Sequence, residues 1–399
     1  MPKKPLITIF LIVFIDLLGF GLILPLLPFI AEEFHASPVQ IGLLVATYSL
    51  FQFISAPILG RLSDRYGRKK MLIISQLGSA VGFILLGVAN SLAMLFISRI
   101  IDGITGGNIS IAQAYIADIT TKKNRAKGMG VIGAAFGLGF MLGPAIGGSL
   151  SNISFATPAF FAAGVAAFTA ITTALFLKET VDVNKAKTSS KTRFSIHHVI
   201  VVLKHHPLGL LTIVFFLINV AFAGMQATYA LWAQATFHFG PSQIGYIFTY
   251  IGFIAVISQL WLLPKVVKKY GETKTLKLSL PLIAIGFFLI PFSFHLSLMF
   301  LANTFIVIGN SLSSPSIQAL ASENVSHNDY GGTLGILQSF ASLGRILGPI
   351  LGGFLFSRYT QAPFIASALF MIFAAFLIQK YLHQPQSPFT KLSRFFQRS

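Results

Sequence analysis

The sequence predicts an all-α integral membrane protein with twelve transmembrane helices, and three observations lead to this fold class. Of the 399 residues, 54% are hydrophobic and only 10% are charged, which is too apolar for an ordinary soluble domain. Three stretches contain no Asp, Glu, Lys or Arg, and each is long enough for two helical crossings of about 20 residues: Gly128–Leu177, Pro207–Pro264 and Leu278–Ser322. Strand-like alternation does not occur in these stretches, so helices must satisfy the backbone in lipid.

The predicted spans follow the apolar runs along the chain. They cover residues 5–31, 39–60, 71–90, 92–118, 128–150, 156–177, 208–235, 243–264, 277–293, 297–321, 331–357 and 361–379. The first run is too long for a signal peptide and has no clear cleavage site. We therefore expect it to be retained as the first span of a multi-pass protein.

The formal net charge of +18 indicates topology rather than a nucleic-acid partner. With both termini cytoplasmic, all but three of the 29 Lys and Arg lie in cytoplasmic tails and loops or beside them. The exceptions are Arg358, on the outer side, and Arg99 and Arg345, within spans. This asymmetry is the positive-inside pattern, and basic loops suit anionic membrane lipids as partners. The absence of cysteine excludes disulfides and thiol chemistry.

An internal repeat predicts two six-helix bundles. The segment "GLGFMLGPAIGG" at 137–148 returns as "SLGRILGPILGG" at 342–353, 205 residues later, and Tyr66-Gly67 matches Tyr270-Gly271. Two such bundles are the layout of transporters that rock about a site near the membrane midplane. The predicted parts are an N-terminal bundle at 1–178, a polar cytoplasmic linker at 179–206, a C-terminal bundle at 207–383 and a cytoplasmic tail at 384–399.

The densest block of charge, "GRLSDRYGRKK" at 60–70, falls between the second and third spans. We expect Gly60 and Gly67 to let the chain turn tightly. The carboxylate of Asp64 can cap or face a helix N-terminus. The alternative is that these charges only fix the topology.

This loop carries a resemblance to a known family. It matches the G-x-L-x-D-R-x-G-R-K signature of the major facilitator superfamily, and three further motifs agree. They are the first-span motif of its drug/proton antiporters (Asp16, Gly19, Pro25, Pro28), the fourth-span R-x-x-x-G motif (Arg99, Gly103) and the fifth-span G-x-x-x-G-P-x-x-G-G motif (Gly139, Gly143, Pro144, Gly147, Gly148). The sequence resembles most the tetracycline-exporter-like branch, which implies the major facilitator fold.

The resemblance implies a latch at the inner gate. Asp64 would meet the start of the eleventh span, near Gly331. Arg65 or Arg68 would pair with Asp118, the acid that ends the fourth span. In the second copy of the loop, Lys268 stands where Asp64 aligns, so the second latch would be weaker.

Small residues in the fifth span form a stripe that permits close helix packing. Gly139, Gly143 and Gly147 are four apart, and such spacing lets another helix approach, while Pro144 removes a backbone hydrogen bond. The eleventh span repeats the stripe with Gly344, Gly348 and Gly352, and Pro349 repeats the proline. Close packing is the minimal interpretation; the resemblance adds a role as the rocking contact between the bundles.

Charged residues inside spans are functional candidates, because each costs at least about 2.5–3.5 kcal/mol there. Arg99 and Asp102 are three apart and can pair on one helix face, and Gly103 and Gly106 should leave room beside them. Burial favours a protonated carboxyl and a nearby arginine favours an ionised one. We predict that Asp16 and Asp102 exchange protons and that Arg99 tunes them, with a structural ion pair as the alternative.

A substrate cavity is predicted from polar and aromatic residues in the spans. Arg345 would bind an anionic substrate group or pair with Asp16 or Asp102; the sequence leaves both open. The other candidates are equally suited to helix–helix contacts: Tyr48, Gln52, Asn108, Gln113, Gln226, Tyr229 and Trp232. Tetracycline exporters also carry acids in the third and ninth spans, and this chain has none there, which argues against tetracycline itself.

The sequence therefore predicts a monomeric, proton-coupled exporter of small amphipathic molecules in a bacterial inner membrane, with protons as coupling ion and no cofactor or metal. The alternative is a transporter of a specific metabolite, sugar or lipid-like substrate, including one that works by uptake. An enzyme is not expected, because no HExxH, Walker or G-x-S-x-G motif occurs.

Overall fold

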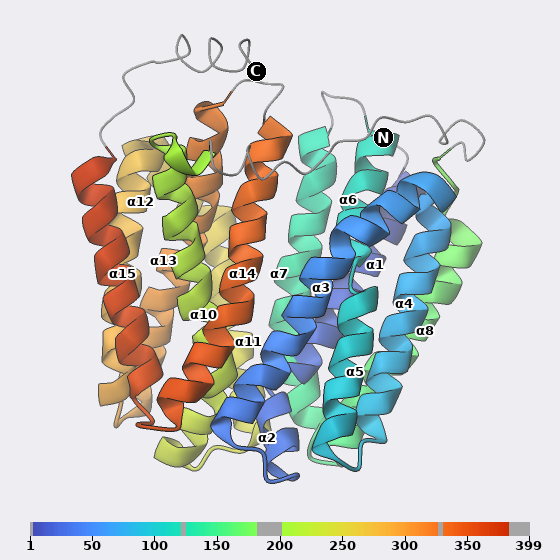
Figure 1. The fold of residues 1–399 in the computed structure, drawn as a ribbon, viewed down its shortest axis with the longest axis horizontal. Helices are drawn as coiled ribbons and strands as arrows, with labels where there is room; N and C mark the ends of the chain where they lie inside the picture. The colour runs from blue at the N-terminus through green and yellow to red at the C-terminus, as the bar shows by residue number, and fades with distance from the viewer. Residues whose placement is uncertain (1–2, 121–124, 182–201, 326–329, 383–399) are drawn as a thin grey trace. The chain divides into compact units, whose positions relative to one another are not determined.

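The computed structural model describes residues 3–120, 125–181, 202–325 and 330–382. Within these ranges every regular element is a helix, and Figure 1 traces them from α1 in blue to α15 in red. The prediction of an all-α protein is therefore confirmed. Most of the predicted linker and the whole predicted tail lie outside the described residues.

The chain divides into two compact units. Unit 1 comprises Met1–Lys191 and Gln226–Phe253, and unit 2 comprises Thr192–Met225 and Ile254–Ser399. The boundaries fall inside two helices, so residues 226–253 pack with the N-terminal helices. This grouping follows packing, whereas the predicted bundles at 1–178 and 207–383 follow the sequence repeat, and those boundaries stay a prediction.

Unit 1 is built around buried apolar side chains from α1, α4, α6 and α7, among them Ile12, Leu72, Tyr115 and Ala135. It also contains the end of α10 (Leu208–Phe237) and most of α11 (Pro241–Ile257). Its other helices are α1 (Lys3–Ile23), α2 (Leu27–Glu32), α3 (Pro38–Tyr66), α4 (Arg68–Gly87), α5 (Leu92–Thr105), α6 (Asn108–Ile119), α7 (Arg125–Leu150) and α8 (Ala156–Phe176).

Unit 2 contains the first part of α10 and the helices that follow α11. A π-helical segment at Ser258–Leu262 leads into α12 (Leu263–Leu289), which a short 3-10 segment extends to Phe292. The remaining helices are α13 (Leu296–Glu323), α14 (Tyr330–Phe356) and α15 (Ala362–Tyr381).

Within the described residues, eleven helical stretches are long and apolar enough to cross a membrane. One of them, Pro241–Phe292, has 52 residues and covers the eighth predicted span and all but the last residue of the ninth. The eleven stretches therefore overlap all twelve predictions, and the chain is a multi-pass integral membrane protein. Gly271, at φ 75°, interrupts the long stretch; the count of twelve crossings stays a prediction.

Two predicted spans are interrupted. The first breaks between α1 and α2 at residues 24–26, because Pro25 has no N–H and restricts the residue before it. The fourth breaks between α5 and α6 at Gly106 and Gly107. The side chain of Gln52 donates to the Gly106 carbonyl at 2.9 Å, which satisfies a backbone acceptor that the break leaves free.

The charged loop at 60–70 is mostly helical, so the predicted turn at Gly60 is wrong. Helix α3 continues through Gly60 to Tyr66, and α4 begins at Arg68. Only Gly67 lies between the two helices, with φ 105°, a conformation that favours glycine. Gly271, its partner in the sequence repeat, also has positive φ.

Candidate functional site

Asp16 lies on α1 beside the break between α5 and α6. The side-chain amide of Asn108, the first residue of α6, donates to Asp16 Oδ1 at 2.8 Å. Because a helix start carries partial positive charge, this position favours a carboxylate. Asn108 is fully buried, so the residue predicted to line a substrate cavity is a partner of the α1 acid.

Arg99 and Asp102 form the predicted pair on one face of α5. Arg99 Nη1 lies 3.3 Å from Asp102 Oδ2, and both residues are 4% exposed. The guanidinium carbon also lies 5.7 Å from the ring centre of Phe83 on α4, within the range of a cation–π contact. Arg99 Nη2 has no hydrogen-bond partner within the described part of the chain.

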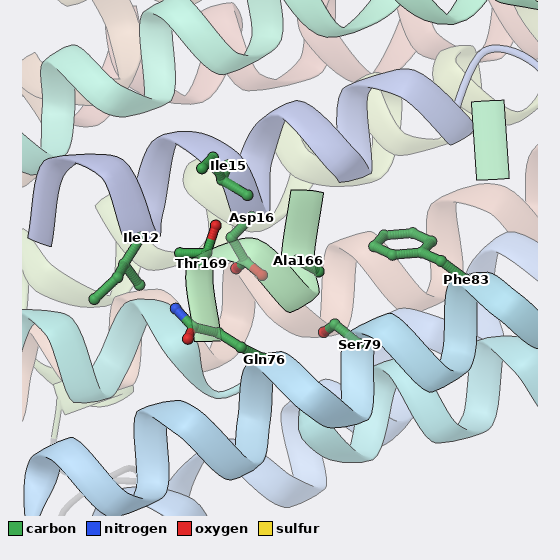
Figure 2. Close-up of a pocket in the computed structure, with 8 residues that line it drawn as sticks. All are labelled: Ile12, Ile15, Asp16, Gln76, Ser79, Phe83, Ala166 and Thr169. Atoms are coloured by element: carbon green, nitrogen blue, oxygen red, sulfur yellow. The ribbon is translucent and has the colours of Figure 1, made fainter. Parts of the chain in front are cut away.

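A small cavity lies beside the Asp16 side chain, and one of its lining residues, Phe83, also contacts Arg99. Its volume is about 10 Å³. Figure 2 shows the Asp16 carboxylate pointing from α1 toward Gln76 and Ser79 of α4, with Thr169 of α8 beside it. Asp102 packs against α4 at Gly82, one turn after Ser79, and its carboxyl interacts with the Ser79 side chain and with Asp16. The cavity is lined by Ile12, Ile15, Asp16, Gln76, Ser79, Phe83, Ala166 and Thr169.

Gly103 on α5 and Gly106, in the break that follows it, do not leave the expected room. A Cβ built on Gly103 would lie 2.7 Å from the Tyr48 carbonyl oxygen, and one on Gly106 would lie 3.3 Å from the Tyr48 hydroxyl. The prediction of free space beside the pair is therefore wrong, because α3 packs directly against the end of α5. The motif glycine serves this close approach.

Arg68, the first residue of α4, is the centre of a charged network near the C-terminal end of α3. It forms an ion pair with Asp64, and its Nε lies 3.1 Å from Asp118 Oδ2. Its Nη1 also donates to Ser63 at 2.6 Å. Of the two predicted partners of Asp118, the structure selects Arg68, which is buried, whereas Arg65 is exposed and its guanidinium lies over the Tyr66 ring.

Glu179 completes this network, and sequence reasoning missed it. Its carboxylate accepts from the backbone N–H groups of Arg68 at 2.8 Å and Lys69 at 3.1 Å, so it caps the start of α4. The next residue, Thr180, donates to Asp118 at 3.1 Å. An acid directly after an apolar span was the available signal, but its partner lies far away in sequence.

The glycine stripes pack as predicted, and each unit has its own example. In unit 1, a Cβ on Gly143 of α7 would lie 2.8 Å from the Leu18 carbonyl oxygen of α1. A Cβ on Gly139 would lie 2.8 Å from the Leu17 Cβ. In unit 2, Gly344 and Gly348 of α14 approach α10 in the same way. On the opposite side of α7, Gly148 lies against Pro241, Ser242 and Gly245. Pro144 and Pro349 each lie inside their helix.

Arg345 of α14 is held within unit 2. Its Nη2 donates to Ser342 at 2.8 Å and its Nη1 to the Asn219 side chain of α10 at 3.4 Å. Both of these partners are neutral, and an arginine side chain keeps its charge in a protein. The predicted roles of Arg345 stay open.

The other predicted cavity residues lie in different environments. Gln52 donates to the Tyr48 hydroxyl at 2.9 Å. Gln113 is exposed and Gln226 is half-buried. Tyr229 and Trp232 are fully buried in an aromatic cluster with Phe248 and Phe237. Whether these residues contact a substrate stays a prediction.

Taken together, the geometry offers two carboxyl groups, an arginine and a small cavity lined in part by polar side chains, all within apolar helices. Such an arrangement can bind and release a proton, because the charge of each carboxyl depends on its neighbours and on solvent access. Within the described ranges, no three His, Cys, Asp or Glu side chains gather as metal ligands.

Comparison with known proteins places these features in a family context. A profile described as Major Facilitator Superfamily matches residues 9–309 and, in an overlapping match, 228–396. The chain is 34% identical over 374 residues to Multidrug resistance protein 2 of Bacillus subtilis (strain 168), covering 92% of this chain and 93% of that protein. It is 32% identical over 390 residues to Tetracycline resistance protein, class H, of Pasteurella multocida, covering 96% and 97%.

Solved structures give the same fold. The human organic anion transporter MFSD10 (TETRAN) superposes with a TM-score of 0.72 at 26% identity, covering 95% of this chain and 100% of that chain. A bacterial homologue of the human lysosomal transporter Spinster, in an inward-facing and unoccupied conformation, superposes with a TM-score of 0.78 at 16% identity, covering 97% and 99%. The second likeness concerns the fold alone.

Proposed function

The chain belongs to the major facilitator superfamily, and we propose that it is a proton-coupled exporter of small amphipathic molecules that works by alternating access. The relatives named as multidrug and tetracycline resistance proteins support export of drug-like compounds. We place it as a monomer in a bacterial inner membrane, with protons as the coupling ion and no cofactor. As a transporter rather than an enzyme, it moves its substrate chemically unchanged.

The observation that carries this proposal is the cluster of Asp16, Arg99 and Asp102 inside apolar helices. Ionised groups in a span are expensive and are rarely present without a functional reason. The carboxyl groups interact with one another and with a single arginine, so loss of a proton from one of them changes the balance for both. A cationic substrate would compete with the proton for the same carboxylate.

The available energy is sufficient for useful export. One proton that crosses a potential of about 100 mV releases about 2.3 kcal/mol, and a pH difference of one unit adds about 1.4 kcal/mol. Together these terms sustain a substrate gradient of roughly a few hundred-fold.

Transport in inverted vesicles with an imposed pH gradient tests the proposal. We expect a lipophilic cation from a panel of cations, anions and a tetracycline to enter the vesicles and to trigger proton release. Asp16→Asn should abolish both signals, because an amide cannot carry the proton. Glu33→Gln is the matched acid-to-amide control on an exposed residue outside the spans. If Asp16→Asn and Asp102→Asn both transport as well as the parent, the proton assignment fails.

Export of organic anions is a second candidate. It is favoured by Arg345, a permanent positive charge within a predicted span, and by the likeness to a human organic anion transporter. In the same assay, anion-driven uptake that disappears in Arg345→Gln, with cation uptake absent throughout, would favour this candidate over the first.

We propose that the network around Arg68 acts as a latch at the inner gate. Arg68 bridges Asp64 and Asp118, while Glu179 caps the next helix. Asp64 is 59% exposed in its side chain, so it remains available to a further helix terminus. We expect charge-neutral variants at Asp64 to change the rate of transport rather than substrate choice.

A further inference from the structure

We propose that the cavity between α1, α4 and α8 is a binding site for one water molecule, and that this water connects Asp16 to Asp102 through Ser79 as a proton relay. The relay role rests on the proposed proton coupling; the water site itself rests on geometry alone. Both the size of the cavity and the polar atoms around it support the assignment.

A water site needs a cavity of sufficient size with polar groups around it. A cavity of about 10 Å³ corresponds to the space that one water occupies. An internal water also needs two to four polar partners. Gln76, Ser79 and Thr169 line the cavity together with Asp16, and all three are at least 97% buried.

Gln76 provides the second condition, because its amide nitrogen lacks a partner. The Thr173 hydroxyl of α8 donates to the Thr169 carbonyl at 2.7 Å and lies 3.1 Å from Gln76 Oε1, so it contacts one of the two polar atoms of the Gln76 amide. Gln76 Nε2 is buried and has no hydrogen-bond partner among the described residues. An unsatisfied buried N–H is costly, and a water in the cavity would accept from it.

Asp16 and Ser79 supply the remaining partners. Asp16 Oδ1 already accepts from Asn108, which leaves Oδ2 for the cavity that the residue lines. The Thr169 hydroxyl donates to the Val165 carbonyl at 2.8 Å, so toward the water it can only accept. Ser79 links the site onward, because it lies one turn before Gly82 of α4, against which Asp102 packs, and its side chain interacts with the Asp102 carboxyl. Among the described residues that line the cavity, Asp16 is the one charged group; Arg99 lies over the Phe83 ring and pairs with Asp102.

Transfer along this chain balances without any further reactant. Protonated Asp16 gives its proton to the water, the water gives one of its own to Ser79 Oγ, and the Ser79 hydroxyl proton passes to the Asp102 carboxylate. Three O–H bonds break and three form. The net result is one proton moved from Asp16 to Asp102, with water and serine unchanged.

Infrared difference spectroscopy of the full chain in lipid vesicles tests both parts. A pH jump should produce an O–H stretching band that shifts in H₂¹⁸O, together with carboxyl C=O bands assigned by Asp16→Asn and Asp102→Asn. We expect Gln76→Leu and Thr169→Val to remove the isotope-sensitive band and to slow proton exchange between the two carboxyls by about a hundredfold. Thr172→Val is the matched control on the same helix, because its hydroxyl contacts the Thr169 carbonyl and does not line the cavity.

The outcomes separate this inference from the proposed function. A parent protein without the isotope-sensitive band, or a Thr169→Val variant that retains it, overturns the water site even if proton-coupled export holds. A band that disappears while exchange keeps its rate overturns the relay. Export that survives Asp16→Asn and Asp102→Asn removes the proposed coupling and leaves the bound water as a structural finding. Because Thr169→Val is nearly isosteric, its folding can be verified by thermal unfolding beside the control.

Discussion

At the scale of single residues, the Arg99–Asp102 pair shows how two buried charges are stabilised within apolar helices. Removing two ions from water is costly, and only their mutual attraction and further hydrogen bonds compensate for it. Arg99 has a carboxylate at 3.3 Å and an aromatic ring at 5.7 Å, and Asp102 has Ser79 in addition. Each charge is thus stabilised mainly by a partner that a single substitution can remove.

Replacing one partner should therefore be worse than replacing both. We expect Arg99→Met to destabilise the fold by about 3–5 kcal/mol, because it leaves Asp102 as an uncompensated buried charge. The double variant Arg99→Met/Asp102→Leu should recover most of this loss. Thermal unfolding of the full chain in detergent measures the difference, with Arg61→Met, an exposed arginine on α3, as the control. A double variant less stable than either single variant would contradict the prediction.

At the scale of elements, the connection between α3 and α4 consists of one residue. Gly67 turns the chain at φ 105°, and a Cβ there would collide with the Glu179 carboxylate. That carboxylate is needed where it is, because it accepts from the first two N–H groups of α4. Gly60, in contrast, lies inside α3, and apart from the backbone of its own helix and its chain neighbours, no described atom lies within 4 Å of the position that a Cβ would occupy there.

The two glycines of the same loop should therefore respond in opposite ways to alanine. Gly67→Ala should destabilise the protein by about 1–3 kcal/mol, since it combines backbone strain with displacement of Glu179. Gly60→Ala should be neutral or stabilising by about 0.5–1 kcal/mol, because alanine is favoured over glycine within a helix. Denaturation midpoints of both variants in one detergent compare them directly. Equal losses would show that the loop, rather than the conformation of Gly67, determines the effect.

At the scale of the whole molecule, both units repeat one packing device. Glycines of α7 admit α1 in unit 1, and glycines of α14 admit α10 in unit 2. The turn glycines Gly67 and Gly271 repeat as well, although a carboxylate is in contact range only at Gly67. A duplicated design with one modified copy agrees with the loss of the acid at Lys268.

The predicted topology can be tested because the chain has no cysteine. Lys70→Cys, at the start of α4, should react with a membrane-impermeant maleimide in inverted vesicles and not in intact cells. Ser154→Cys, between α7 and α8, should show the reverse pattern. Both positions are exposed, so a missing signal reports the side of the membrane rather than burial. Labelling of Lys70→Cys in intact cells would overturn the positive-inside assignment.

The sequence by itself determined the helical class, the approximate spans, the charged residues within them and the glycine stripes. These features are local: lipid demands about 20 apolar residues in a helix, and residues three or four apart share a helix face. The pairing of Arg99 with Asp102 and the close packing of the stripes follow from the same rules. The break at Gly106 and Gly107 is local too, but apolar composition continues across it.

Only the tertiary structure decided which distant residues meet. Asn108 contacts Asp16 across 92 residues, Arg68 contacts Asp118 across 50, and Glu179 reaches the start of α4 across 111. No short pattern encodes these distances, because they depend on how whole helices pack. The same packing filled the space beside Gly103 with α3 and brought Gln76, Ser79 and Thr169 to the α1 carboxylate.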